Sequence, residues 1–442
     1  MTSSFPQVLL ALTAGVFVII LLTTKYKVPA FFALLIACFL VGVAVQMPVS
    51  NIITVVKDGF GNIMRSLGLI IILGTALGVL LEQTGSTRVM AAYILKKTGE
   101  RRAPLAMSIT GFIVGLPIFC DSGYIVLSGL NNSLARRTGI PLVIMSISLA
   151  TGLYSVHCLL PPHPGAAAAA STIGVDFGKL ILIGIVVAIP ATIAGYLWAR
   201  YSGRNVTGMK VLEEETITST SKPSVLNAFL PVLIPILLIA MNSFFSIDNP
   251  VDSTFMKIFS ILGDPVIALS IGVLLAFNTN RNWKKERVAK ILQEAAEKAG
   301  GILVIIGAGG AFGAVLATTN LGGHFSQSLS LNYFGIFFPF LLTFILKTAQ
   351  GSSTVAIITA SSIVLPLLPS LGLDSDNGKL LCVLSMGAGS MMISHANDAY
   401  FWVISKFSGL DMKTMLKVYS VATLLMGLVT LLMVYIISLI LL

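Results

Sequence analysis

Formal charge is scarce in this sequence. Only 10% of its 442 residues are Asp, Glu, Lys or Arg, whereas 56% are hydrophobic. A soluble domain carries about 25% charged residues, and this chain has too few to cover a soluble surface. The mean hydropathy of +0.94 requires lipid as the solvent for most of the length. The composition therefore excludes a soluble enzyme, a nucleic-acid binder and a disordered scaffold.

Several other features are missing. The four cysteines all lie in apolar stretches, which argues against structural disulfides. The first residues show neither a basic n-region nor a small-residue cleavage site, so we expect 5–24 to be a retained first span. The apolar runs are continuous rather than alternating, which predicts helices instead of an outer-membrane barrel. The sequence contains no P-loop, which excludes an ATP-driven pump within this chain.

What is present is a series of long apolar runs. Hydropathy predicts ten membrane spans, approximately at 5–24, 28–47, 66–83, 140–170, 178–199, 224–245, 256–278, 300–318, 379–403 and 414–441. Two further apolar blocks, 103–135 and 332–369, are broken in the middle and predict re-entrant hairpins. Residues 51–65 mix charged and apolar positions and predict a short interfacial helix.

The charges of the loops orient these spans. The net charge is +10, and the basic residues concentrate in the loops 84–102, 136–139, 200–223, 279–298 and 404–413. The positive-inside rule places these loops in the cytoplasm and both termini outside. This distribution predicts a multi-pass membrane protein and explains the net charge without an acidic partner or nucleic acid.

The two halves of the chain echo one another. Gly74 and Gly78 correspond to Gly309 and Gly313, and His157 corresponds to the later His395 at nearly the same offset. The sequence therefore predicts an all-α polytopic membrane protein of two inverted repeats, 1–200 and 224–442, joined by a cytoplasmic linker at 201–223. Each repeat has five spans and one re-entrant hairpin, with helices broken at the midplane, as in secondary transporters.

Two of the breaks lie in the first half. The motif LPIFCDSG (116–123) forms the predicted tip of the first hairpin, where Ser122, Gly123 and backbone amides can hold an anion. Asp121 is an acid within an apolar block and is a candidate carrier of a coupling proton. The prolines of PPHPG (161–165) must unwind the next span. His157 and His163 flank this unwound segment and are candidate substrate ligands.

The other two breaks lie in the second half. Lys347 precedes the predicted hairpin tip QGSST (350–354) and needs a carboxylate partner from the protein or the substrate. The candidate substrate-binding residues around it are Gly351, Ser352, Ser353 and Thr354, together with His395 and Asn397 of SHAND (394–398). Asp398 is the second candidate proton carrier.

Each candidate also has a purely structural interpretation. Asp121 would then cap the helix that follows it, the histidines would bind backbone carbonyls, and Lys347 would form a structural pair with Asp398. The sequence leaves these alternatives open.

The motifs FCDSGY (119–124), HCLLPPHPG (157–165), GSSTVAIITA (351–360) and SHANDAYFW (394–402) resemble those of the gluconate permease family, within the ion transporter superfamily. The resemblance covers nearly the whole chain. It implies uptake of gluconate or related sugar acids, or of D-serine in some members, generally by proton symport, and a dimeric assembly of inverted repeats.

The sequence thus predicts a proton-coupled importer of a small sugar acid or hydroxy carboxylate, with no enzymatic activity, resident cofactor or metal. A sodium-coupled carboxylate or D-serine transporter is the nearest alternative. An intramembrane metalloenzyme that uses the histidines and acids is the remote one.

Overall fold

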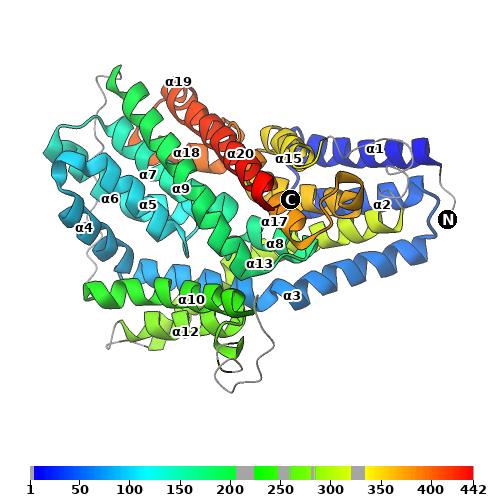
Figure 1. Cartoon of the computed structure of the whole chain (residues 1–442), viewed down its shortest axis with the longest axis horizontal. Coiled ribbons are helices and arrows are strands. Elements are labelled where there is room, and N and C mark those ends of the chain that lie inside the picture. Colours follow the sequence, from blue (N-terminus) through cyan, green and yellow to red (C-terminus); the bar gives the residue numbers. More distant parts are fainter. Residues whose placement is uncertain are drawn as a thin grey trace.

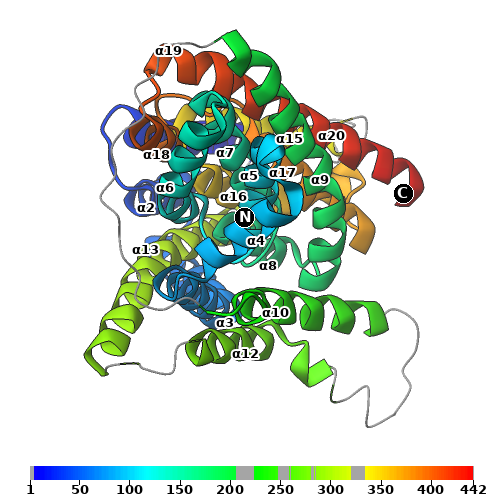
Figure 2. The same cartoon turned by 90° about the vertical axis from the view of Figure 1, so that its left-hand side faces the viewer.

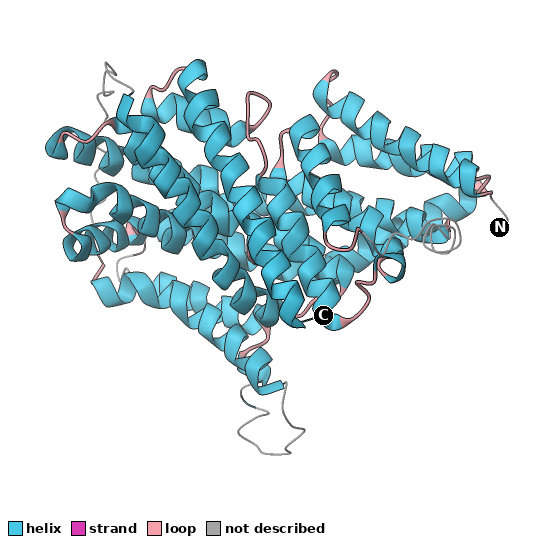
Figure 3. Ribbon diagram, turned by 45° about the horizontal axis from the view of Figure 1, so that its top comes forward, coloured by secondary structure: helices cyan, strands magenta, loops and turns pink. Residues whose placement is uncertain are grey.

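The computed structural model describes residues 4–205, 223–246, 258, 260–279, 283, 285–319 and 334–441. All regular elements within these ranges are helices, which confirms the predicted all-α class (Figure 3). A helix satisfies its own backbone hydrogen bonds, and this is what a chain solvated by lipid requires.

The first half of the chain forms nine α-helices in the order in which Figure 1 colours them from blue to green. They are α1 Phe5–Thr24, α2 Ala30–Ala44, α3 Val49–Gln83, α4 Ser86–Thr98, α5 Ala103–Gly115, α6 Cys120–Thr138, α7 Leu142–Leu159, α8 Pro164–Ile173 and α9 Phe177–Ser202.

The second half contains α10 Val225–Ser246, α12 Pro265–Asn278, α13 Lys285–Thr318, α15 Phe337–Gln350, α16 Ser353–Val364, α17 Asp376–Met391, α18 Ala399–Ser408, α19 Met412–Met415 and α20 Val421–Leu441. A π-helical turn, Leu416–Ser420, joins α19 to α20. Short 3-10 turns follow α16.

In the part of the chain that the structure describes, seven helical segments are long and apolar enough to cross a membrane. They differ in how deeply they lie inside the protein. The apolar window of Leu142–Ile173, which contains α7 (Leu142–Leu159) and α8, is 94% buried, whereas those of Phe5–Thr23 and Met412–Leu441 are 22% buried. The first segment therefore forms the centre of the bundle, and the other two leave most of their apolar surface for lipid.

The predicted division of residues 49–83 into an interfacial helix and a separate span is wrong. The structure has one helix, α3, of 35 residues. No proline interrupts it, and Lys57, Asp58 and Arg65 are exposed while Ile52 and Leu67 on the opposite face are buried. The charges mark a polar face of a continuous amphipathic helix rather than a break.

Two of the predicted basic loops are also largely helical. The segment 84–102 contains α4, and most of 279–298 is the first half of α13, a helix of 34 residues. Lys and Arg are good helix formers, so basic residues alone do not end a helix. The predicted loops 246–254 and 319–331 and the linker 201–223 lie mainly outside the described residues.

The two interrupted blocks each form a pair of helices. The first pair is α5 and α6, joined by 116–119, and the second is α15 and α16, joined by 351–352. The two predicted broken spans are also interrupted in the structure, between α7 and α8 and between α17 and α18. The last of these helices continues to Ser408, beyond the predicted end at 403.

Small residues bring the central helices into close contact. A Cβ on Gly59 of α3 would lie 2.7 Å from the carbonyl oxygen of Gly310 in α13, and one on Gly152 of α7 would lie 2.3 Å from that of Ser108 in α5. Such contacts allow dispersion attraction between helix backbones, which apolar lipid cannot replace.

The most buried helices of the two halves each pack against several helices of their own half. In the first half α7 packs against α5, α6 and α9, and in the second half α17 packs against α15, α16 and α20. The halves also meet directly, since α3 packs along α13, α9 along α20, and α8 against α16. Figure 1 shows α1 and α2 at one end of the molecule and α4 to α6 at the other, and Figure 2 shows α3, α10 and α12 along one side.

Candidate functional site

The tip of the second helix pair is a tight turn pressed against the break between α17 and α18. Gly351 has a φ of +80°, and a Cβ there would lie 2.2 Å from the carbonyl oxygen of Asn397. Both the left-handed conformation and the close approach therefore require glycine. Ser352 begins the next helix, where its hydroxyl oxygen accepts a hydrogen bond from the Val355 amide at 3.3 Å.

Lys347 and Asp398 form an ion pair inside the protein. The Lys347 Nζ lies 2.8 Å from Asp398 Oδ2, and their side chains are 0% and 8% exposed. Lys347 also donates to the Gly351 carbonyl at 3.4 Å. Asp398 accepts two further hydrogen bonds, from the Ser394 hydroxyl at 2.5 Å and from the Tyr400 amide at 3.0 Å. The carboxylate thus has more partners than the ammonium group that neutralises it.

The residues around Asp398 tie the broken helix to the hairpin tip. Asn397 Nδ2 donates to the Thr348 and Ala349 carbonyls at 2.8 and 3.1 Å, and His395 Nε2 donates to the same Thr348 carbonyl at 3.0 Å. These bonds cross from the α17–α18 break to the last turn of α15. They satisfy carbonyl groups in the last turn of α15, where such groups have no partner within the helix.

The breaks of the first half are joined in a similar way. His163 is buried, and its Nε2 donates to the Gly115 carbonyl at 2.6 Å, at the end of α5. Its ring lies 4.9 Å from that of His157 and 6.1 Å from that of Phe119, measured between centroids. The Nδ1 atoms of both histidines are buried without a hydrogen-bond partner in the described structure.

Contacts between the halves bring the four breaks together. The Tyr154 hydroxyl of α7 donates to the Ser390 carbonyl at 3.1 Å, and the Tyr400 hydroxyl of α18 donates to the Ala150 carbonyl at 3.2 Å. These two tyrosine rings stack with centroids 5.7 Å apart. Asp121, in the first turn of α6, lies close enough to Asp398 for their charges to interact. A single polar region therefore draws residues from both halves.

Several buried polar atoms at the second hairpin tip have no hydrogen-bond partner among the described residues. They are both amide atoms of Gln350, the hydroxyl of Thr348 and the Asn397 Oδ1. An unsatisfied buried polar group costs about 1–3 kcal/mol. These unpartnered atoms lie near the Lys347–Asp398 ion pair and can form hydrogen bonds with a polar ligand.

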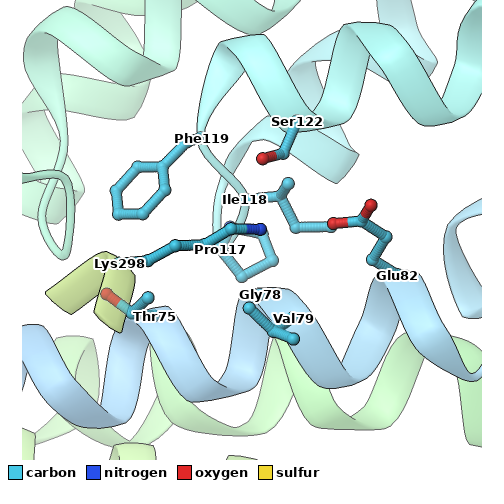
Figure 4. Close-up of a pocket in the computed structure, with 9 residues that line it drawn as sticks. All are labelled: Thr75, Gly78, Val79, Glu82, Pro117, Ile118, Phe119, Ser122 and Lys298. Carbon is cyan, nitrogen blue, oxygen red and sulfur yellow. The ribbon is translucent and has the colours of Figure 1, made fainter. Parts of the chain in front are cut away.

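A pocket opens on the other side of the first hairpin tip (Figure 4). The pocket is a shallow, solvent-open hollow, and the space between its lining atoms, open solvent included, is about 230 Å³. The pocket lies between α3, the α5–α6 turn and α13, and it is lined by Thr75, Gly78, Val79, Glu82, Pro117, Ile118, Phe119, Ser122 and Lys298.

The structure brings together most of the residues singled out in the sequence. Ser353 is buried and Thr354 half-buried at the start of α16, where Thr354 Cα would be 3.3 Å from a Cβ on Gly165. Gly123 packs against Leu153 in α7. Ser122 differs, because it lines the pocket beside Phe119 instead of the Lys347–Asp398 pair.

Sequence reasoning missed other residues of the region. Tyr154 and Tyr400 lie inside quoted motifs, but aromatic residues in apolar helices carry no signal of their own. Lys298 was counted with the predicted basic loop 279–298, and Glu82, near the end of the predicted span 66–83, was not singled out. Within the described residues, no three His, Cys, Asp or Glu side chains are grouped closely enough to hold a metal ion.

Apolar helices interrupted around a buried polar region are the architecture of membrane transporters. One solved structure, the Alcanivorax borkumensis YdaH transporter, has a similar fold, with a TM-score of 0.65 at 15% identity over 88% of this chain and 89% of that one.

Sequence comparison identifies the family. The chain belongs to the GntP family permeases, whose family model matches residues 7–440. A gluconate permease of Pseudomonas aeruginosa is 33% identical over 435 residues, which are 96% of each chain. The high-affinity gluconate transporter of Escherichia coli is 32% identical over 426 residues, 94% of this chain and 95% of that one.

This membership confirms the resemblance found in the sequence motifs. Since the relatives are named permeases and transporters, the chain is a transmembrane transporter of the gluconate permease family rather than an enzyme. The several apolar spans agree with a multi-pass protein of the inner membrane.

Proposed function

We propose that this protein takes up gluconate or a related small sugar acid together with a proton. The observation that carries the proposal is the buried Lys347–Asp398 pair at the tip of the second hairpin. A buried cation suits the carboxylate that all sugar acids share, and the names of the relatives support this substrate class.

Competition for Lys347 would couple the two binding events. While Asp398 is charged, it occupies the ammonium group at 2.8 Å. A proton on Asp398 removes that counter-charge, and the substrate carboxylate then takes its place beside Lys347. The Ser394 hydroxyl that bonds the same Oδ2 holds the carboxyl group in position. Asp121 is the second candidate for the proton, because its charge interacts with that of Asp398.

The polar groups near the pair would recognise the hydroxyl groups of the substrate. Gln350, Thr348 and Asn397 present unpartnered atoms at the hairpin tip, and Ser352, Ser353 and Thr354 follow on the start of α16. His157, His163 and His395 add ring nitrogens from the two broken helices. The Gly351 turn and the nearby Ser122–Gly123 segment would allow the hairpin tips to close on the ligand.

We further propose that the two halves are inverted repeats, 1–200 and 224–442, with the α5–α6 and α15–α16 pairs as re-entrant hairpins. The matching neighbours of α7 and α17 support this arrangement. With five spans in each half both termini would lie on the same side, and the positive-inside rule would put that side outside. The assembly would be a homodimer, as the family resemblance implies. Relative movement of hairpins and broken helices would alternate access to the site.

The test is uptake of radiolabelled gluconate into proteoliposomes. We expect an inward pH gradient to drive uptake, a protonophore to abolish it, and Lys347→Ala to remove it, whereas Lys413→Ala, an exposed lysine of α19, has no effect. Uptake that needs sodium at constant pH would support the sodium-coupled alternative. Uptake of D-serine but of no sugar acid would contradict the substrate class.

A further inference from the structure

The pocket in Figure 4 is separate from the Lys347–Asp398 pair, and it contains charges of its own. Lys298 reaches into it from α13 and Glu82 from α3, and both side chains are partly exposed. Thr75 and Ser122 add hydroxyl groups, while the remaining lining is apolar. The pocket thus combines one cation, one carboxylate and hydroxyl groups with an apolar wall, a mixed lining that can contact a small polar ligand.

The charge balance of the pocket indicates how it would treat an anion. Lys298 pairs with Glu294 one helical turn away, at 2.8 Å. Among the described residues Glu82 forms no ion pair within 4 Å, although its charge interacts with those of Lys298 and Glu294. Arg287 donates to the Gln83 carbonyl at 3.3 Å and adds a positive charge at the same end of α3. The other nearby α-helix, α4, carries Arg88 just after the end of α3.

Phe119 separates this pocket from the interior. Phe119 lines the pocket, and the centroid of its ring lies 6.1 Å from that of His163 and 6.5 Å from that of His157. The His157 ring stacks on that of Tyr154, with centroids 6.4 Å apart. The Tyr154 ring in turn stacks on that of Tyr400, which lies two residues after Asp398 in the sequence. A continuous series of rings therefore leads from the pocket to the buried ion pair.

We propose that this pocket is the cytoplasmic docking site for the carboxylate of the transported sugar acid, with Lys298 as its cationic partner and Ser122 as a hydroxyl donor. The carboxylate leaves the interior past Phe119 and is held by Lys298 before release. Glu82 opposes the binding of this carboxylate, because the negative charge of Glu82 lies in the same pocket. This inference rests on the proposed function and on the orientation that places the α3–α4 connection in the cytoplasm.

The experiment compares membrane vesicles of both orientations, with radiolabelled gluconate as the probe. In inside-out vesicles the pocket faces the bath. There we expect Lys298→Gln to raise the KM for gluconate about tenfold, the loss typical of a charge-assisted hydrogen bond. In right-side-out vesicles the same variant keeps its KM within about twofold, because the Lys347 site is unchanged.

Three further variants sharpen the test. Lys298→Arg retains the charge and restores the KM of inside-out vesicles. Glu82→Gln removes the opposing charge and lowers that KM. Lys290→Gln, an exposed lysine on the same helix, serves as the matched control and leaves both values unchanged.

The outcomes separate this site from the proposed function. Suppose that the wild-type protein transports gluconate, but Lys298→Gln changes the KM in neither vesicle orientation, or changes it equally in both. Either result overturns the docking site and leaves the proposed function intact. An effect confined to right-side-out vesicles also overturns it, since the pocket then opens outside. A wild-type protein that moves no sugar acid overturns both.

Discussion

Single substitutions of Lys347 and Asp398 are expected to destabilise the protein by different amounts. The double substitution is expected to lower the free energy of unfolding by less than the two single losses added together. Breaking a buried ion pair by removing one partner costs about 3–5 kcal/mol, because a charge is left uncompensated. In Lys347→Met, Asp398 keeps the Ser394 hydroxyl and the Tyr400 amide as donors. In Asp398→Asn, Lys347 keeps only the Gly351 carbonyl at 3.4 Å and the new amide oxygen.

The retained partners set the order of the effects. Lys347→Met should lie near the lower end of the range, about 3 kcal/mol, and Asp398→Asn near the upper end, about 5 kcal/mol. The double variant leaves no buried formal charge, so we expect it to lose only about 1–2 kcal/mol. The pair would then have a coupling energy of several kcal/mol, well above the scatter of independent sites.

Thermal unfolding in detergent can measure this order. All four cysteines are buried, so a thiol-reactive fluorophore labels the protein only as it unfolds. The unfolding temperature should fall in the order wild type, double variant, Lys347→Met, Asp398→Asn. If the double variant loses as much as the two single variants together, the pair is not coupled and the reasoning is refuted. A double variant that is stable but inactive in gluconate uptake would show that the pair serves transport.

Two other substitutions test the contacts around the site. Gly351→Ala should lower both the unfolding temperature and uptake, because the added Cβ would lie 2.2 Å from the Asn397 carbonyl oxygen. Gly139→Ala is the matched control, since Gly139 has a φ of +69° and no atom within 4 Å of the added Cβ. This control should lose only about 1–2 kcal/mol through left-handed strain and should keep normal uptake. Tyr154→Phe should lower stability by about 1–3 kcal/mol in the same fluorescence assay, because the Ser390 carbonyl loses its donor, and an unchanged unfolding temperature would contradict the role of that bond.

The sequence was most informative where the chain violates the usual rules for apolar helices. Prolines, glycines and charged residues within apolar blocks predicted all four interruptions, because such residues are costly in lipid unless they serve a purpose. The tip at Gly351 and the break before Asp398 lie within the motifs that predicted them. The association of Lys347 with Asp398 was one of two alternatives, and only the fold shows how closely they approach.

Long-range features could not be predicted in the same way. A hydropathy window measures transfer into lipid and is insensitive to helix continuity, so it divided α3 and shortened α13. Glu82 and Lys298 come from opposite halves of the chain, and only the packing of α3 along α13 brings them into one pocket. The positions of Tyr154 and Tyr400 depend likewise on contacts between the halves.

The contact of Gly59 with Gly310 implies something about the surrounding bilayer. α3 and α13 run in opposite directions, and each has a charged first half and an apolar second half, so the charged half of one lies beside the apolar half of the other. A helix of 35 residues is about 52 Å long, far more than the roughly 30 Å hydrocarbon core. Lipid cannot solvate the exposed Lys57, Asp58 and Arg65 at the depth of their apolar neighbours. The excess length means that α3 tilts or extends beyond the hydrocarbon core, which makes the thickness of the host bilayer a determinant of how the protein sits.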